Sequence, residues 1–232
     1  MTKYKPYKLY QLYVVVYCAL IVGCTLMGLR YTYIHVPYTH FTFQLGAAVY
    51  LFPAVFIIDD IVTEVYGYDM AKKMMWSGML SLAIVTGLVW LAMAYPDNHK
   101  MAVNNSDYNY MFIQLPQVFL GYTVAMIVGT LFNNYLLSSL KVAWHGKYFP
   151  IRSIMSSAAG ELIYQVIGTT IAFWGRLDFL HDTVAIIVFC YFYKLLFDVV
   201  GSVISYPLQK WTKKKEGIDV YDHNVSLNPF KH

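Results

Sequence analysis

Charged residues are scarce in this sequence. Asp, Glu, Lys and Arg make up 13% of its 232 residues, which is about half of their usual share in a soluble domain. A soluble chain with so few charges could not cover its surface, so the composition excludes an ordinary soluble domain. The sequence also lacks the short segments of alternating polar and apolar residues that a transmembrane β-barrel needs.

Several signatures of catalysis and metal binding are absent as well. No Walker A, HExxH or GxSxG motif occurs, so nothing points to ATP hydrolysis, zinc proteolysis or serine hydrolysis by this chain. The three cysteines, Cys18, Cys24 and Cys190, lie in apolar segments without metal-ligand spacing, and the histidines are scattered over loops and tails. We expect no metal, no cofactor and no enzymatic activity. Because the basic residues lie in loops and at the tail, we expect no nucleic-acid partner.

Long apolar segments are what the sequence has instead, with hydrophobic residues at 58% and a mean hydropathy of +0.47. A helix of about 20 apolar residues crosses roughly 30 Å of hydrocarbon and satisfies its own backbone hydrogen bonds. The sequence therefore predicts an all-α integral membrane protein whose partner is the lipid bilayer. We predict one transmembrane domain, residues 1–232, as a six-helix bundle with helices at about 9–29, 43–66, 74–95, 113–140, 152–174 and 184–209, and a tail at 210–232.

The distribution of Lys and Arg predicts the orientation of this bundle. On one side of the six segments lie most of the basic residues, and only Arg30, Lys100 and Arg176 fall on the other. Cytoplasmic loops carry the excess of positive charge. We therefore expect both termini to be cytoplasmic and the protein to reside in the cell inner membrane.

The second segment ends with acidic residues in a helical arrangement. Asp60 and Glu64 are four residues apart and share a face, whereas Asp59 points about 100° away. One interpretation leaves these acids solvated or capping at the cytoplasmic end. The other, which we favour for Asp60, makes Asp60 and Glu64 part of a buried polar site, because charges inside the membrane are expensive and functional. We expect Pro53 to kink this helix.

The fifth and sixth segments carry two further polar pairs at the same spacing. Glu161 and Gln165 lie near mid-membrane, where we favour substrate recognition over a structural hydrogen bond between helices. Lys194 and Asp198 either neutralise one another or have a functional role. Small residues around Gly160 predict close helix packing and would permit a homodimer, and Asn133 and Asn134 are expected to join helices by hydrogen bonds.

Four stretches, taken together, resemble the queuosine precursor transporters, also grouped as a vitamin uptake transporter family. The stretch FPAVFIIDDIVTEVYG followed by AKK is similar to the family's second-helix signature. The fifth segment resembles the family's Arg-x-x-x-Ser-x-x-x-Gly-Glu pattern, here Arg152, Ser156 and Glu161. Lys194 with an acidic residue one turn on, and the tail EGIDVYDHNVSLNPF, are also similar. The family often has an Asp near Tyr164 or Gln165, which this chain lacks.

The resemblance implies uptake of a 7-deazaguanine for tRNA modification: 7-cyano-7-deazaguanine, 7-aminomethyl-7-deazaguanine or queuine. The residues suit that chemistry, because a carboxylate can accept hydrogen bonds from the ring N–H and the exocyclic amine of a guanine-like edge. We expect Glu161 to be that carboxylate and Gln165 its partner. The rest of the expected substrate-binding set comprises Asp60, Lys194, Asp198, Glu64, Arg152 and Ser156, with Phe52, Phe56 and Tyr164 as rings for stacking.

Three other functions fit some of these features. A substrate-binding subunit of an energy-coupling-factor vitamin transporter would also have six helices and no ATPase motif. An intramembrane enzyme could use Asp60 and Glu64 as an acid pair, although ion-pair networks also perturb acids. A purely structural membrane protein would not need Glu161 at mid-membrane.

Overall fold

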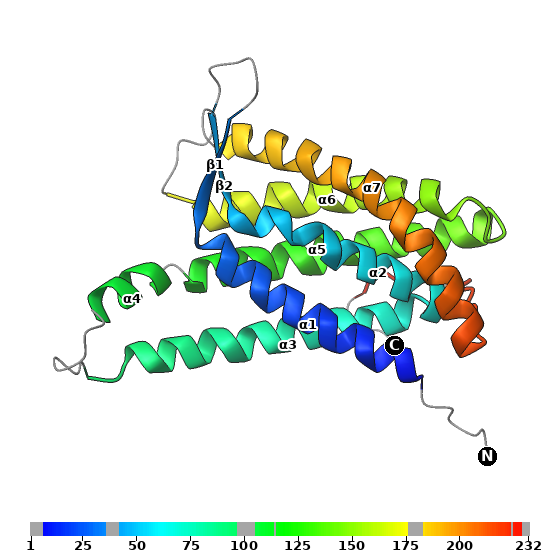
Figure 1. Ribbon diagram of the computed structural model, residues 1–232, viewed down its shortest axis with the longest axis horizontal. Helices are drawn as coiled ribbons and strands as arrows, with labels where there is room; N and C mark the ends of the chain where they lie inside the picture. Colours follow the sequence, from blue (N-terminus) through cyan, green and yellow to red (C-terminus); the bar gives the residue numbers. More distant parts are fainter. Residues whose placement is uncertain are drawn as a thin grey trace.

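The computed structural model describes residues 7–35, 42–96, 105–113, 115–175, 183–223 and 225–228. It is a bundle of long helices that lie side by side, with a β-hairpin and the short helix α4 at one end (Figure 1). The elements are α1 Lys8–Gly28, β1 Tyr31–His35, β2 Thr42–Gly46, the 3₁₀ helix Ala47–Tyr50, α2 Phe52–Tyr66, α3 Tyr68–Met93, α4 Asn105–Phe112, α5 Leu115–Ala143, α6 Phe149–Phe173 and α7 Val184–Glu216. The helical fold class is confirmed.

The start of the second predicted helix is wrong. Residues 42–46 form β2, which pairs antiparallel with β1 from Tyr31↔Gly46 to His35↔Thr42. The helix begins only at Phe52, and Pro53 therefore lies in its first turn. A proline there loses no intrahelical hydrogen bond, so the kink expected at Pro53 has no physical cause and that prediction is wrong too.

The third helix also begins earlier than predicted, at Tyr68, directly after a break at Gly67. Gly67 has φ of +88°, a left-handed conformation that favours glycine. A Cβ at this position would also lie 2.8 Å from Val220 Cγ1. Two reasons therefore favour glycine at this break: the backbone conformation of the turn and the close packing of the C-terminal segment against it.

Helices α5 and α6 pack closely through small residues. A Cβ added to Gly160 would lie 2.7 Å from Asn133 Cβ and 2.8 Å from Gly129 O. The predicted tight packing of this small-residue face is confirmed, and it takes place within one chain. The homodimer that the same residues suggested stays a prediction.

Within the described residues, four stretches are long and apolar enough to cross a membrane: Lys8–Gly28, Tyr68–Met93, Ser106–Ala143 and Val184–Glu216. Helices α2 and α6 are not among them, because α2 has 15 residues and both carry several polar side chains. Large apolar side chains are exposed along the four stretches, and examples are Leu80, Ile84 and Leu88 on α3 and Phe192 and Val203 on α7. Such an exposed apolar surface is typical of contact with lipid.

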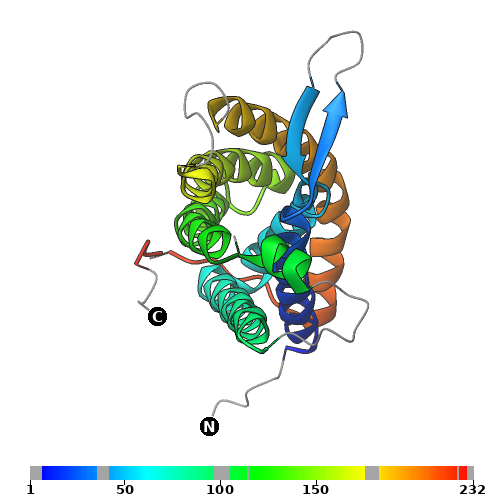
Figure 2. The same cartoon turned by 90° about the vertical axis from the view of Figure 1, so that its left-hand side faces the viewer.

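Helix α2 is largely buried and packs against α1, α3, α5 and α7. Seen from the hairpin end, the long helices α1, α3, α5, α6 and α7 form a ring (Figure 2). Because α2 is enclosed by protein, its acidic side chains have protein partners in place of lipid.

The start of α1 and the end of α7 meet at the end of the bundle opposite the hairpin (Figure 1). The Leu9 backbone N–H donates to Glu216 Oε1 at 2.7 Å. The described parts of the two terminal regions are thus on one side, as an even number of crossings requires. Several basic residues behind the orientation prediction, Lys3, Lys5, Lys100, Arg176 and Lys231, lie outside the described residues.

Candidate functional site

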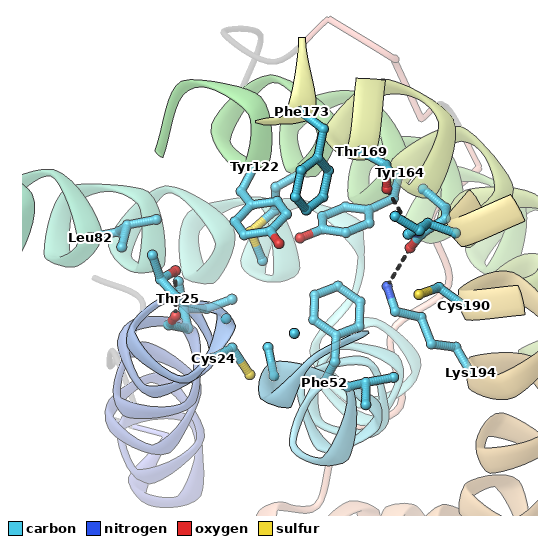
Figure 3. A pocket seen from close by; sticks show the side chains of 18 residues that line it. Cys24, Thr25, Phe52, Leu82, Tyr122, Tyr164, Thr169, Phe173, Cys190 and Lys194 are labelled. Carbon is cyan, nitrogen blue, oxygen red and sulfur yellow. Dashed lines mark hydrogen bonds between the residues drawn. The ribbon is translucent and has the colours of Figure 1, made fainter. Parts of the chain in front are cut away.

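A cavity of about 300 Å³ lies in the half of the bundle nearest the hairpin. It is bounded by the last residues of α1 and α6 and by the first turns of α7 (Figure 3). Most of its wall is apolar, and its polar side chains come from α1, α5, α6 and α7. The lining residues are Ile21, Cys24, Thr25, Gly28, Gly46, Ala48, Val49, Phe52, Leu82, Tyr122, Met126, Tyr164, Gln165, Thr169, Phe173, Ile186, Cys190 and Lys194.

Lys194 enters the cavity from α7 and is held by contacts with two other helices. Its ammonium group donates a hydrogen bond to Gln165 Oε1 at 3.0 Å and lies 3.6 Å from the centroid of the Phe52 ring. Gln165 in turn donates from Nε2 to Thr169 Oγ1 at 2.7 Å. Lys194 and Asp198 are both described, and no ion pair within 4.0 Å joins them, so their mutual neutralisation stays a prediction. The interhelical hydrogen bond considered for Gln165 does occur, and its donor is Lys194.

Two aromatic rings lie beside this ammonium group, and a third stacks on one of them. The Phe52 and Tyr164 ring centroids are 4.7 Å apart, and Tyr122 stacks on Tyr164 at 6.1 Å with 12° between the ring planes. Lys194 Nζ also lies 4.7 Å from the Tyr164 centroid. Flat apolar faces next to a fixed cation are suited to a planar, polar heterocycle.

Four of the residues predicted to bind substrate line the cavity: Phe52, Tyr164, Gln165 and Lys194. Phe56 lies behind them, in edge-on contact with Tyr164. Sequence analysis missed Tyr122 and Thr169. Thr169 could have been found by extending the Glu161–Gln165 spacing by one more turn, whereas Tyr122 gave no signal among the many other tyrosines.

Asp60 lies deeper in the bundle, in a cluster with Asn133, Ser153 and Ser157. Asn133 Nδ2 donates to Asp60 Oδ1 at 2.9 Å, and the hydroxyls of Ser153 and Ser157 donate to Oδ2. Asp59 accepts from Asn134 Nδ2 at 3.2 Å. Both acids are at most 2% exposed, so the interpretation that left them solvated is wrong. The prediction that Asn133 and Asn134 join helices is confirmed.

Glu64 is the centre of a second cluster, nearest the ends of the chain. Arg152 binds its carboxylate with two hydrogen bonds of 3.0 and 3.2 Å, and Lys213 Nζ donates at 2.7 Å. Lys141 Nζ lies 3.8 Å away and donates to the Glu64 backbone carbonyl. Glu64 and Arg152 are buried, and a buried pair of this kind is stable only because nearly every lone pair and proton has a partner. Ser156 donates to the Ser153 carbonyl and contacts neither cluster's carboxylate.

The chain after α7 closes over the Glu64 cluster as a strap, residues 219–222. Asp219 pairs with Lys141 at 2.5 Å and Lys213 at 2.9 Å, and the Val220 N–H donates to Val65 O. Asp222 accepts from the Tyr68 N–H at 2.8 Å at the start of α3. Partial burial raises the pKa of Asp219, but hydrogen bonds from Lys141 and Lys213 lower it further, so this pKa lies below its usual value.

Buried polar residues on α6 connect the cavity with these clusters. Ser153, Ser157, Glu161, Gln165 and Thr169 recur at every fourth position and are all buried. We call this set the α6 stripe. Glu161 lies on it between Gln165, which lines the cavity, and Ser157, which bonds Asp60. Asp198 is buried one turn beyond Lys194 on α7.

A bundle of apolar helices with a cavity near one end, from which a buried polar stripe leads away, is typical of a membrane protein of the transporter class. A family comparison gives the same class: residues 46–208 match the family of vitamin uptake transporters. This chain belongs to that family, as the sequence resemblance predicted. Neither the comparison with curated proteins nor that with solved structures gave a match.

Proposed function

We propose that this protein carries queuosine precursors, 7-deazaguanine bases, into the cell across the inner membrane. The observation that carries the proposal is the cavity, in which the Lys194 ammonium, the Gln165 amide and the Phe52 and Tyr164 rings meet. Its volume of about 300 Å³ is at the lower end of the range for ligand pockets, which favours a single fused-ring base over a nucleotide.

The polar groups of the cavity complement such a base. Lys194 can donate to the ring carbonyl oxygen with a proton that it does not use for Gln165, since an ammonium group has three. Gln165 and Thr169 offer acceptors to the ring N–H and the exocyclic amine, which lie beside the carbonyl on the same edge of the base. Phe52 and Tyr164 offer faces on which a flat ring can stack. Glu161 is not among the residues that line the cavity, so the recognition proposed here rests on Lys194, Gln165, Thr169 and the two rings, and the contact between Glu161 and the substrate that the sequence suggested is not part of it.

The proposal includes six membrane crossings with both termini cytoplasmic. Helix α2 would cross inside the bundle and α6 as part of the ring around it, and neighbouring helices would satisfy the polar side chains of both. The cavity near the hairpin would then face the outside, and the Glu64 cluster with its strap would close the cytoplasmic side. Transport would expose the site to each side in turn.

Uptake by the purified protein tests the proposal. Liposomes that hold only this chain should take up labelled 7-cyano- or 7-aminomethyl-7-deazaguanine, and Gln165→Leu should reduce that uptake at least tenfold. Gln11→Leu, on an exposed position of α1, is the matched control and should leave uptake unchanged. If the parent protein takes up neither of these two bases and does not take up queuine, the proposal is wrong. Tight binding without uptake would favour the alternative, a binding subunit that needs an energy-coupling partner.

A further inference from the structure

Glu161 is a buried carboxylate to which the described part of the chain gives no hydrogen-bond partner. Its side chain is 0% exposed, and neither Oε1 nor Oε2 accepts a hydrogen bond there. Two other buried acids differ: Asp60 accepts from Asn133, Ser153 and Ser157, and Glu64 is paired with Arg152 and Lys213 and lies 3.8 Å from Lys141 Nζ. The fold has thus provided partners for two acids and left Glu161 without one.

The charged surroundings of Glu161 come from two helices. On α2 the charge that reaches it is Asp60, and on α7 it is Lys194. The hydrogen bond between Lys194 and Gln165 joins α7 to α6, and Asp198 and Glu161 each lie one turn from it on their own helix. The other titratable side chains nearby are Cys190 on α7 and Tyr164 on α6 itself. The fourth helix at this level, α5, faces α6 with Gly129 and Asn133, which do not titrate.

Carboxylates therefore outnumber cations at this level of the bundle. Among the described residues, Lys194 is the cation at this level, and its ammonium is directed at Gln165 and the Phe52 ring. Two neighbouring carboxylates that share one cation in a medium of low dielectric constant are not both ionised, because the charged form of the second lacks compensation. Asp198 Oδ2 is also without a hydrogen-bond partner among the described residues, so a proton bound by one carboxyl group of the pair would compensate the missing partner.

Glu161 and Asp198 lie where a bound proton could be exchanged with either side of the membrane. On the α6 stripe Glu161 lies between the cavity and the Asp60 cluster, so solute that leaves the cavity toward the strap passes it. Water that enters from the hairpin side in one state and from the strap side in another would exchange the proton with opposite faces of the membrane.

We propose that Glu161 and Asp198 form a proton-binding site that couples substrate uptake to proton entry. The proton binds from the side to which the cavity is open and is released on the strap side, so one proton crosses with each substrate. Glu161 is then a coupling residue, whereas Gln165 and Lys194 recognise the substrate. This inference rests on the proposed function.

Two transport assays on the same liposomes test the coupling. With the membrane potential clamped at zero and the outside one pH unit more acidic, the parent should accumulate labelled 7-cyano-7-deazaguanine about tenfold, since one pH unit is a tenfold driving force for one proton. Glu161→Gln should lose that accumulation but keep exchange of labelled for unlabelled base at equal pH, which also shows that it folds. Asp107→Asn, at an exposed position on α4, is the control and should behave as the parent.

The contrary outcomes are distinct. Exchange without pH-driven accumulation in the parent, or accumulation that survives in Glu161→Gln, would overturn the proton site and leave the transporter proposal standing. Loss of both exchange and accumulation in a folded Glu161→Gln would overturn it in favour of direct substrate contact. A readout without substrate is the infrared carbonyl band of a protonated carboxyl group at neutral pH. The band should be present in the parent and reduced in Glu161→Gln, and identical spectra would overturn the inference even if no substrate were transported.

Discussion

At the scale of single residues, Lys194 is the cation on which recognition in the cavity depends. Lys194→Met keeps the apolar stem but removes the ammonium group that bonds Gln165 and lies over Phe52. A hydrogen bond to a charged group contributes about 1.5–3 kcal/mol, so we expect binding of a 7-deazaguanine to weaken by about 10- to 100-fold. Equilibrium binding in detergent measures this, and Lys214→Met at an exposed position should bind as the parent. If both variants bind the 7-deazaguanine with equal affinity, Lys194 does not contribute to substrate binding.

Glu64 is the residue whose loss should damage the fold most. Glu64→Gln keeps the shape but leaves the buried Arg152 without a carboxylate, and Lys213 keeps only Asp219. Breaking a buried ion pair by removing one partner costs about 3–5 kcal/mol. We therefore expect a markedly lower unfolding midpoint in detergent, with Asp107→Asn as the unaffected control. An unchanged midpoint would mean that water or other groups already compensate the cations.

Residue spacing predicted which side chains share a helix face, but not what they meet across the bundle. The i, i+4 spacing placed Gln165 beside Glu161 on one helix and Lys194 beside Asp198 on another, but it did not predict that Gln165 and Lys194 would meet. Their hydrogen bond depends on how far α6 and α7 are rotated toward one another, which the sequence does not encode locally. The same limit explains why Arg152, marked only by family resemblance, proved to be the partner of Glu64.

At the scale of elements, the contact between α5 and α6 depends on Gly160. Gly160→Ala would place a methyl group 2.7 Å from Asn133 Cβ and 2.8 Å from a backbone oxygen, and overpacking of this kind costs about 1–3 kcal/mol. Gly87→Ala is the matched control, because a Cβ on Gly87 has nothing within 4 Å and alanine favours the helix by about 0.5–1 kcal/mol. Unfolding midpoints in detergent should therefore shift in opposite directions. A shift in the same direction would argue against tight packing at Gly160.

Long apolar segments predicted the existence of all the long helices, but the boundaries of α2 were beyond the sequence. Residues 43–51 are nearly as apolar as a helix that crosses a membrane, so composition favoured a continuation of the helix. Residues 42–46 pair with residues 31–35 as antiparallel strands, and hydropathy does not detect such a pairing. The early start of α3 was missed for a related reason, since Tyr68 is buried there by a contact with Asp222 of the strap, which is distant in sequence.

At the scale of the whole molecule, the strap joins the end of α7 to α2, α3 and α5. Its anchor Asp219 has a pKa below the usual 3.8 because Lys141 and Lys213 outweigh partial burial. A carboxylate of this kind stabilises the docked strap fully above its ordinary pKa, and the contribution is lost as the pH falls through the lower folded value. We therefore expect docking to be insensitive to pH from about 5 to 8.

Asp219→Asn tests the strap at neutral pH, where the acid itself cannot be titrated. The variant should expose the end of α7 and speed tryptic cleavage after Lys213–Lys215 several-fold in vesicles that present this end to the protease. Asp107→Asn is again the control, because α4 lies at the other end of the bundle. Equal cleavage rates in the two variants would show that Asp219 does not hold the strap.

The composition of the Glu64 cluster has a consequence for the order in which the chain is made. Arg152 is translated 88 residues after Glu64, and Lys213 149 residues after it, so α2 is synthesised long before its charges can be neutralised. A helix of 15 residues with three acids does not enter lipid alone, since each acid costs about 2.5–3.5 kcal/mol at the membrane centre. During synthesis α2 must therefore wait at the membrane surface or within the insertion machinery until α5, α6 and α7 have been delivered.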